Sequence, residues 1–294
     1  MGKSAVAVEL AQRLGGEILS ADSMQVYRGL DIGTAKPTTE RALVAHHLVD
    51  LVGPGEDFDA ARWLAAARSA EADVRKRGRL PILCGGTGLY FRAWREGLDA
   101  MPSPDPELRQ VLEAQPLDAL WSELEHNAPE VWARIDRNNP RRLVRAVEIL
   151  RLGGALPHTE SAPKAEQLDA SGPIFVLRRA PEDLRRRMEV RVDAMFAQGL
   201  VEETRRLLEL GLRDNRTARQ AIGYRQVVEH LEGVRDLPAT VAEVKARTWQ
   251  YGRRQMTWFR HRPGVVWVDV DSAEPASMTA ARILIHPEFG VHTN

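Results

Sequence analysis

The chain has 294 residues with 41 Lys and Arg against 41 Asp and Glu, and 44% of its residues are hydrophobic. This composition excludes disorder as the main state, and no apolar run reaches the about 18 residues that a membrane-spanning helix needs. The single cysteine, Cys84, excludes an internal disulfide and a cysteine-based zinc site. Because no apolar signal segment opens the sequence, it favours a cytoplasmic protein in a reducing compartment.

The net charge of zero hides an uneven distribution along the chain. Residues 101–139 carry 3 basic and 8 acidic side chains, residues 140–262 carry 24 and 16, and residues 263–294 carry 1 and 4. The basic surplus in the middle segment fits a polyanionic partner. Since 36 of the 41 basic residues are arginine, coding bias explains the surplus equally well, and charge alone leaves both interpretations open.

Strand-like and helix-like patterns alternate over the first hundred residues. Apolar residues with helical spacing begin at Ser4 and stop at Gly15-Gly16, a common helix C-terminus. Short apolar runs bounded by turn residues follow. The expected elements are a helix over 4–14, strands over 17–20, 47–51 and 80–84, and a helix over 58–77. This alternation predicts a mostly parallel sheet flanked by helices.

The pattern changes after residue 100. Three prolines between 102 and 106 predict a linker that starts a helix, helical segments continue to residue 152, and a long loop is expected over 153–173. The expected elements after it are a strand over 174–179, helices over 181–210, 225–231 and 238–261, and a strand over 265–270. The sequence therefore predicts an α/β core over 1–100 and 172–294, interrupted by a helical insertion over 101–171. The helices of 181–235 are counted with the core, with packing against the insertion as the alternative.

Gly2-Lys3-Ser4 leads directly into the first expected helix. These residues match the last three positions of the phosphate-binding loop GxxxxGK[ST] of nucleotide-binding and ATP-binding proteins, in which Lys neutralises phosphate oxygens and the hydroxyl ligates Mg²⁺. A match of three residues is also consistent with an ordinary helix start. On the first interpretation, a strand and the rest of the loop precede Gly2. We then expect a chain extended upstream by about ten residues to be more stable and more active.

Five segments, in order, carry a family resemblance. They are LSADSMQVYRGLDIGTAKPT (19–38), CGGTGLYFRAW (84–94), NNPRRLVRAVEIL (138–150), ARQAIGYRQ (218–226) and RRQMTWFR (253–260). With them, nearly the whole chain resembles the tRNA dimethylallyltransferases in their bacterial form. The resemblance implies a P-loop-type α/β core with an inserted helical domain that contacts tRNA.

The resemblance also implies a reaction, transfer of the dimethylallyl group of dimethylallyl diphosphate to N6 of the adenosine at position 37 of tRNA, 3′ of the anticodon. This amine is a poor nucleophile until a base accepts its proton. Asp22 follows the strand over 17–20, where an open α/β sheet presents its ligands, and is the expected base. Thr87 follows the strand over 80–84 and is expected to bond the amine or the diphosphate. Both residues are also consistent with ordinary turns.

The departing diphosphate gathers negative charge, which suitably placed cations stabilise. The candidates are Lys3, Ser4 with Mg²⁺, and Arg225, which makes Gly2, Lys3 and Ser4 the expected diphosphate-binding residues and Ser4 the expected Mg²⁺ ligand. A further set is expected either to shape the same pocket or to form a structured loop. Its members are Asp31, Thr34 and Lys36.

An adenine in a folded anticodon loop must leave its stack to react. The resemblance assigns tRNA contact to Asp22, Ser23, Met24, Gln25, Thr87, Arg109, Arg141, Arg142, Leu143, Val144, Arg145, Arg219, Gln220, Ala221, Ile222, Gly223 and Tyr224. The basic residues of 185–187 and 245–262 have no such assignment and are expected on solvated helix faces. The aromatic residues among them, Trp249, Tyr251, Trp258 and Phe259, are more typical of core packing than of base stacking.

Two other classes of protein share part of this pattern. A P-loop kinase of a small metabolite shares Gly2-Lys3-Ser4 and the parallel sheet but leaves the arginine-rich segments unexplained. A non-catalytic RNA-binding module explains those arginines but not Asp22 and Thr87 at strand ends. The remaining expectations are a monomer without membrane contact.

Overall fold

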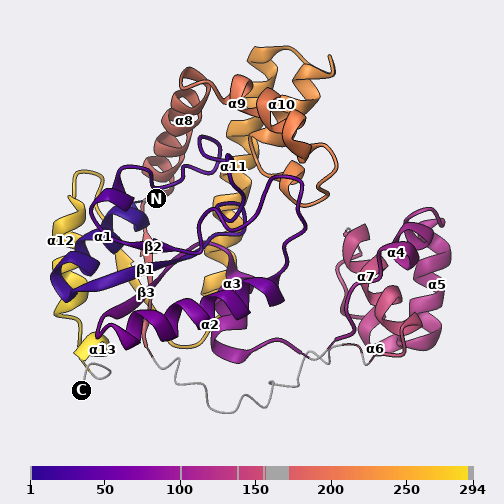
Figure 1. Ribbon diagram of the computed structural model, residues 1–294, viewed down its shortest axis with the longest axis horizontal. Coiled ribbons are helices and arrows are strands. Elements are labelled where there is room, and N and C mark those ends of the chain that lie inside the picture. Colours follow the sequence, from indigo (N-terminus) through magenta and orange to yellow (C-terminus); the bar gives the residue numbers. More distant parts are fainter. Residues whose placement is uncertain (1, 100, 138, 155, 157–171, 291–294) are drawn as a thin grey trace. The chain divides into compact units, whose positions relative to one another are not determined.

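The computed structural model describes residues 2–99, 101–137, 139–154, 156 and 172–290 (Figure 1). The chain divides into two units, one formed by Met1–Arg95 and Ala170–Asn294 and the other by Glu96–Asp169. The helices between residues 181 and 235 therefore belong to the first unit. Most of the loop expected over 153–173 lies outside the described residues, as does Asn138.

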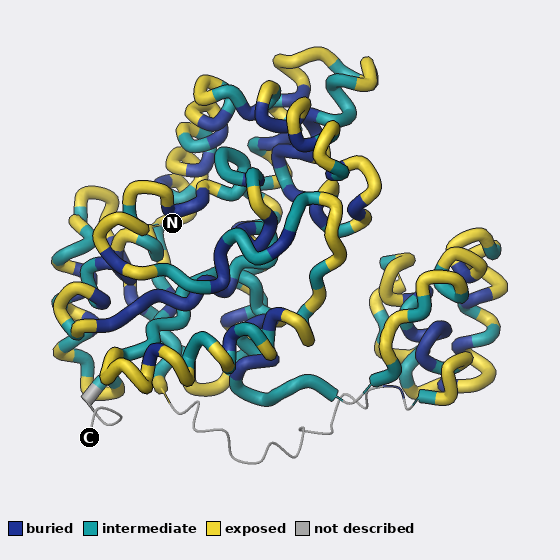
Figure 2. The backbone as a smooth tube through the Cα atoms, in the orientation of Figure 1, coloured by how far each residue is buried: buried dark blue, intermediate teal, exposed yellow. Residues whose placement is uncertain are grey.

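The first unit contains a parallel sheet of three strands. In the order β2-β1-β3, these are β2 (His46–His47), β1 (Gly16–Ala21) and β3 (Leu80–Gly85). Every residue of β1 is buried, and Figure 2 shows it as a continuous dark stretch. The strand expected over 47–51 was wrong in its extent. It ends at His47 because Leu48 and Asp50 have left-handed φ angles of 65° and 60°.

Two further strands form a second parallel sheet. They are β4 (Ile174–Arg178) and β5 (Val265–Asp269), in register from Ile174 opposite Val265. All strand pairs among the described residues are parallel, as the sequence predicts, but they belong to two sheets rather than one.

Helix α1 (Lys3–Leu14) packs against both sheets. Val6 joins a cluster with Val268 of β5, whereas Ala7 and Ala11 pack with Ile18 of β1. Two C-terminal helices that the sequence did not predict follow β5, namely α12 (Ala276–Leu284), which packs against α1, and α13 (Pro287–Gly290). Helix α1 is thus packed on two sides, one against each sheet.

Helix α2 (Ala60–Lys76) covers β1 and β3, and α3 (Gly88–Glu96) follows β3 directly. Trp63 of α2 stacks on Tyr90 of α3 at a ring-centroid distance of 4.1 Å, and its Nε1 donates to the carbonyl of Ser20 at 3.1 Å. A stacked aromatic pair contributes about 1 kcal/mol beyond its buried area. This contact anchors both helices to the end of β1.

The remaining helices of the first unit form a group that follows β4. They are α8 (Pro181–Ala197), α9 (Leu200–Leu207), η2 (Leu208–Leu212), η3 (Ala218–Gln220), α10 (Tyr224–Leu231) and α11 (Leu237–Arg260), while η1 (Glu40–Ala42) precedes β2. The sequence predicted one helix over 181–210. The structure breaks it at Gly199, whose φ of 96° redirects the chain and buries Leu200. Among the described helices, none has both the length and the apolar character needed to cross a membrane.

The second unit is a small helical domain. Its helices are α4 (Pro106–Glu113), α5 (Leu117–Asn127), α6 (Pro129–Trp132) and α7 (Pro140–Arg151). Leu112, Leu120, Leu124 and Leu143 are completely buried and form its apolar core.

A charged cluster lies at the side of this core. Glu148 is fully buried and accepts hydrogen bonds from Arg109 and Arg145, both at 2.6 Å, and from the backbone N–H of Asp105 at 2.9 Å. Burial alone would raise the pKa of Glu148, but the bonds from Arg145 and Arg109 outweigh burial and lower that pKa below its ordinary value. Glu148 therefore joins the N-terminus of α4 to α7.

We predict that Glu148→Gln lowers the free energy of unfolding of the second unit by roughly 2–4 kcal/mol near neutral pH, because two arginines lose their buried counter-charge. Since the folded-state pKa of Glu148 is lowered, the stabilisation is complete above the ordinary pKa of about 4.5 and is lost as the pH falls through the folded-state value. Hydrogen exchange of the α7 amides measures both effects. Glu123→Gln, which breaks a more exposed pair with Arg151, is the control. Equal losses in the two variants would contradict a special role for Glu148.

Candidate active site at the carboxyl edge of the first sheet

The ends of β1 and β3 bring two sequence-predicted residues together. The strands are in register up to Ala21 opposite Gly85, so Asp22 and Thr87 leave the sheet at the same edge. The carbonyl of Ala21 accepts from the backbone N–H of Thr87 at 3.1 Å. A Cβ on Gly85 would lie 2.1 Å from that oxygen, which explains why glycine is needed there.

Thr87 is bonded to the residue after Asp22. Its Oγ1 accepts from the backbone N–H of Ser23 at 3.1 Å and donates to Ser23 Oγ at 3.4 Å. Asp22 is half-buried, and its Oδ1 accepts from the backbone N–H of Met24 at 3.0 Å. Asp22 therefore occupies a turn, which was the alternative to a catalytic role in the sequence. The bond from Met24 restricts the direction of the carboxylate.

Helix α8 contributes a cation that the sequence analysis missed. Arg191 is partly buried, and its Nη2 donates to the carbonyl of Thr34 at 3.3 Å. Burial lowers the pKa of Arg191, and the negative charge of Asp22 opposes that shift. Arg191 and Asp22 are thus electrostatic neighbours. The available signal was position, since Arg191 lies between the buried Met188 and Met195 on one face of α8.

Arg225, the arginine that the sequence favoured, lies elsewhere. Its side chain is 55% exposed on α10, where Nε donates to Glu229 at 3.0 Å and Nη1 donates to Gln220 at 3.1 Å. These two partners lie on or next to its own helix. Among the described arginines, the pKa of Arg191 is influenced by the charge of Asp22, whereas Arg225 is bonded to Glu229 and Gln220.

One face of α11 packs against the glycine-rich turn that holds Thr87. Gln255 Nε2 donates to the carbonyl of Gly86 at 2.9 Å, and a Cβ on Gly88 would lie 2.4 Å from the ring of Trp258. Burial, with a contribution from Asp22, raises the pKa of Tyr251 to about 12, against hydrogen bonds with Gln255 and Thr87. The glycines therefore admit a helix face, in addition to any ligand.

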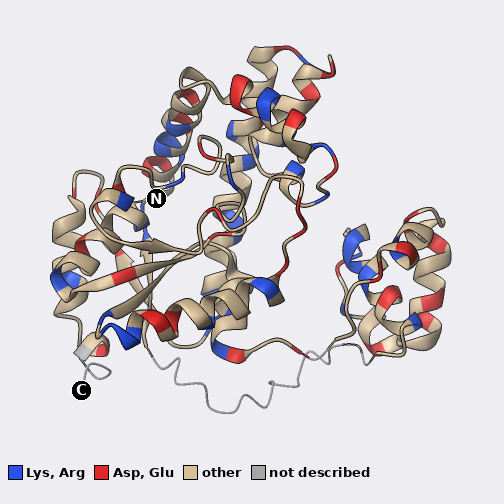
Figure 3. Cartoon of the chain, viewed as in Figure 1, with Lys and Arg blue, Asp and Glu red and all other residues tan. Residues whose placement is uncertain are grey.

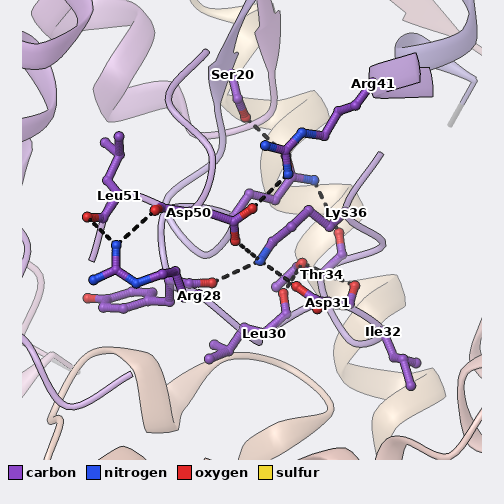
Figure 4. Close-up of polar contacts among 12 residues, drawn as sticks. Ser20, Arg28, Leu30, Asp31, Ile32, Thr34, Lys36, Arg41, Asp50 and Leu51 are labelled. Atoms are coloured by element: carbon purple, nitrogen blue, oxygen red, sulfur yellow. Dashed lines mark hydrogen bonds and ion pairs between the residues drawn. The ribbon is translucent and has the colours of Figure 1, made fainter. Parts of the chain in front are cut away.

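The loop after β1 has a buried lysine at its centre. The side chain of Lys36 is 2% exposed, and its Nζ contacts Asp31 at 2.5 Å, Asp50 at 2.6 Å and the carbonyl of Tyr27 at 2.9 Å (Figure 4). All three donors of the ammonium are occupied. Of the two interpretations for Asp31 and Lys36, the structure supports a structured loop. Thr34 differs, because its carbonyl faces Arg191.

The start of α1 lies near the end of β3. Gly2 has a φ of 103° and is the N-cap of this 12-residue helix, with Lys3 and Ser4 in the first turn. The Sγ of Cys84 lies 3.8 Å from the carbonyl of Lys3. Unbonded N–H groups at a helix start and a lysine together favour an anion.

Comparison with known proteins decides the family. Residues 25–262 match the family model described as IPP transferase, which is most of the chain. The chain belongs to the IPP transferase family. A tRNA dimethylallyltransferase of Anaeromyxobacter dehalogenans is 47% identical over 275 residues, covering 91% of each chain, and one of Geobacter metallireducens is 45% identical, covering 91% of this chain and 89% of its own.

Solved structures of IPP transferases have the same fold. The full-length tRNA isopentenylpyrophosphate transferase of Bacillus halodurans superimposes with a TM-score of 0.72 at 34% identity, covering 99% of this chain and 94% of its own. A eukaryotic dimethylallyltransferase acting on tRNA gives a TM-score of 0.79 at 26% identity, covering 100% of this chain and 77% of its own. The α/β fold with its helical insertion is therefore that of the IPP transferase family.

The residues assigned to tRNA contact differ in their exposure. Buried side chains cannot face RNA directly, and they are those of Gln25, Leu143, Val144, Ala221 and Tyr224. Arg109 and Arg145 are bound to Glu148. The side chains on the surface include those of Arg141, Arg142 and Arg219, with Asp22, Ser23, Met24, Thr87, Gln220 and Ile222 partly exposed, and Gly223 is the buried N-cap of α10.

The core interpretation of the α11 aromatics is confirmed for Phe259. It is 7% exposed and meets Phe91 edge to face at a centroid distance of 5.5 Å. Trp258 packs between Phe259 and the turn at Gly88. The adjacent arginines of α11 lie on its exposed side, as expected for Arg253, Arg254 and Arg260.

We predict that Gly85→Ala lowers the free energy of unfolding by roughly 1–3 kcal/mol, because the new Cβ overlaps backbone that has no room to move. Gly172→Ala is the matched control, since nothing lies within 4 Å of a Cβ at that position. Thermal unfolding of the two variants gives the comparison. If both unfold at the wild-type temperature, the close approach of the two strand ends is not a constraint.

Proposed function

We propose that this chain transfers the dimethylallyl group of dimethylallyl diphosphate to N6 of the adenosine at position 37 of tRNA. The observation that carries the proposal is that Asp22 and Thr87 lie together at one edge of the first sheet, while Arg191 is bonded to the Thr34 carbonyl and its pKa is influenced by the charge of Asp22. A carboxylate next to an arginine provides a proton acceptor beside an anion-binding group. Membership of the IPP transferase family and the tRNA-modifying names of its relatives support the same reaction.

Asp22 is the proposed general base. As N6 forms a bond with C1 of the allyl group, the C1–O bond to the diphosphate breaks and the N6 proton passes to the Asp22 carboxylate. The bond from Met24 N–H to Oδ1 and the bonds between Ser23 and Thr87 fix the direction of that carboxylate. A base held in place contributes typically 10²- to 10⁴-fold, on the order expected for proton transfer in the transition state.

Arg191 is the proposed partner of the leaving diphosphate, in place of Arg225. It is held by the carbonyl of Thr34, and its partly buried position strengthens its attraction for an anion. Lys3, Ser4 and the N–H groups at the start of α1 would bind the same anion. Negative charge that develops on the diphosphate is thereby stabilised.

Mg²⁺ is the proposed cofactor. Among the described residues no group of three His, Cys, Asp or Glu side chains is placed to hold a metal ion. A hard ion bound by the Ser4 hydroxyl, diphosphate oxygens and water fits this donor set, since Mg²⁺ usually keeps water and substrate phosphates as ligands. When bound, it would neutralise charge on the diphosphate.

The anticodon loop of tRNA is the proposed partner, and the protein is proposed to act as a cytoplasmic monomer. The adenine must be extruded to reach Asp22 at the sheet edge. Figure 3 shows basic residues on α7, where the exposed Arg141 and Arg142 stand in the first turn. These side chains are suited to phosphates of the RNA backbone.

We predict that Asp22→Asn reduces kcat by at least about 100-fold, because the amide cannot accept the N6 proton. The assay measures label moving from dimethylallyl diphosphate to unmodified tRNA, with ATP in place of the diphosphate as control. The tRNA dissociation constant should stay within about twofold, since Asn retains the size and turn bond of Asp. For the wild-type protein, ATP turnover without transfer would support a P-loop kinase, and RNA binding without either reaction would support a non-catalytic RNA-binding module. Near-normal transfer by Asp22→Asn would exclude Asp22 as the base.

A matched pair of variants separates the two arginines. We predict that Arg191→Gln lowers kcat/KM for dimethylallyl diphosphate by about 100-fold, the size of loss typical of one oxyanion-stabilising group, whereas Arg225→Gln changes it by less than about threefold. Both variants are compared by the same labelling assay after thermal unfolding has shown that they are folded. The reverse order of effects would restore Arg225 to the site.

A further inference from the structure

A buried pair of side chains joins α9 to α10 behind the active-site edge. Glu203 of α9 is 4% exposed and Tyr224 of α10 is 0% exposed. The Tyr224 hydroxyl donates to Glu203 Oε1 at 2.6 Å. Burial raises the pKa of Tyr224, and the charge of Glu203 adds to that shift, so the hydroxyl keeps its proton for this bond.

The pair holds two consecutive backbone N–H groups of the loop after β1. Ile32 N–H donates to both carboxylate oxygens of Glu203, at 3.1 Å and 3.2 Å, and Gly33 N–H donates to the Tyr224 hydroxyl oxygen at 3.0 Å. A Cβ on Gly33 would lie 2.4 Å from the Tyr224 ring. The ring and the loop are therefore in direct contact, and the hydroxyl and both carboxylate oxygens each have a hydrogen-bond partner.

The next residue connects this loop to the proposed site. The carbonyl of Thr34 accepts from Arg191 Nη2 and from Gln25 Nε2, both at 3.3 Å. Gln25 in turn accepts from Ser20 Oγ, within β1, at 3.0 Å. One carbonyl thus fixes Arg191 relative to β1, the strand that Asp22 follows, and the position of that carbonyl follows from how Ile32 and Gly33 are held.

We propose that Glu203 and Tyr224 are positioning residues for Arg191 that act through the Ile32-Gly33-Thr34 backbone, so that they set the affinity for the diphosphate and not for RNA. This inference rests on the proposed role of Arg191. The segment around Tyr224 is one that the sequence assigned to tRNA contact, but the Tyr224 side chain is enclosed by protein and its hydroxyl is used twice.

Replacing Tyr224 by Phe removes two bonds at once. The ring and its packing against Gly33 stay, while Gly33 N–H loses its partner and Glu203 Oε1 keeps only the bond from Ile32 N–H. Buried polar groups left without a partner destabilise the arrangement that contains them, and the loop would relieve this by moving. Movement of the loop carries the Thr34 carbonyl, and with it Arg191, away from the edge of the sheet.

The test compares Tyr224→Phe and Glu203→Gln with Val227→Ala, a variant of another fully buried residue on α10. Binding of inorganic diphosphate, measured by calorimetry, should weaken about tenfold in the first two variants, which corresponds to about 1.4 kcal/mol. Val227→Ala should lower the unfolding temperature to a similar degree but leave diphosphate binding within about twofold. The tRNA dissociation constant should be unchanged in all three.

A double-mutant cycle tests whether the effect passes through Arg191. In an Arg191→Gln background, Tyr224→Phe should weaken diphosphate binding by less than about twofold further, since coupled residues are not additive. Full additivity would overturn the proposal, and so would weaker tRNA binding with diphosphate binding intact. Diphosphate binding is measured without transfer. Wild-type protein that binds the anion but does not modify tRNA would therefore contradict the proposed function, whereas the positioning role of Glu203 and Tyr224 would still be decided by the binding measurements.

Discussion

The approach of two strand ends governs the geometry of the candidate site. β1 and β3 remain paired up to Ala21 and Gly85, and the Ala21 carbonyl then receives the N–H groups of the turn that carries Thr87. Space for this contact exists because Gly85 lacks a Cβ. Asp22 and Thr87 are therefore neighbours through backbone pairing, and the side-chain bonds between Ser23 and Thr87 refine a position that the sheet has already set.

Packing of two helices around that edge completes the candidate site. Gln255 and Trp258 of α11 contact the glycine-rich turn, and Arg191 of α8 donates to the Thr34 carbonyl. Both helices come from the end of the chain opposite to the strands they support. The site is thus assembled from the two ends of one unit, which explains why its parts are far apart in sequence.

Local patterns in the sequence were sufficient to predict the parallel strands and the two residues that follow them. Asp22 and Thr87 each come after a short apolar run, and parallel strands present their carboxyl ends together. Arg191 was not found, because its proposed role depends on a contact with the Thr34 carbonyl, which is far away in the sequence. Tyr224 was assigned to tRNA contact from a motif match, and such a match contains no information about which way a side chain points.

Arginine count was similarly a poor guide to an RNA surface. The single carboxylate of Asp183 accepts hydrogen bonds from Arg179, Arg186 and Arg187. Arg185 forms a pair with Glu189 on the same helix, consistent with the solvated helix face expected for 185–187. Much of the positive charge in 140–262 is therefore balanced within the fold, and the share that remains for a partner depends on contacts that composition does not reveal.

The position of α1 has an evolutionary consequence. Its small residues Ala7 and Ala11 fit against the first sheet, while Val6 fits against the second. A larger side chain on either sheet would need a compensating change on this helix, which would then disturb the opposite sheet. Substitutions in β1, β5 and α1 are thus expected to covary as a set of three, even though the two strands themselves are not paired with each other.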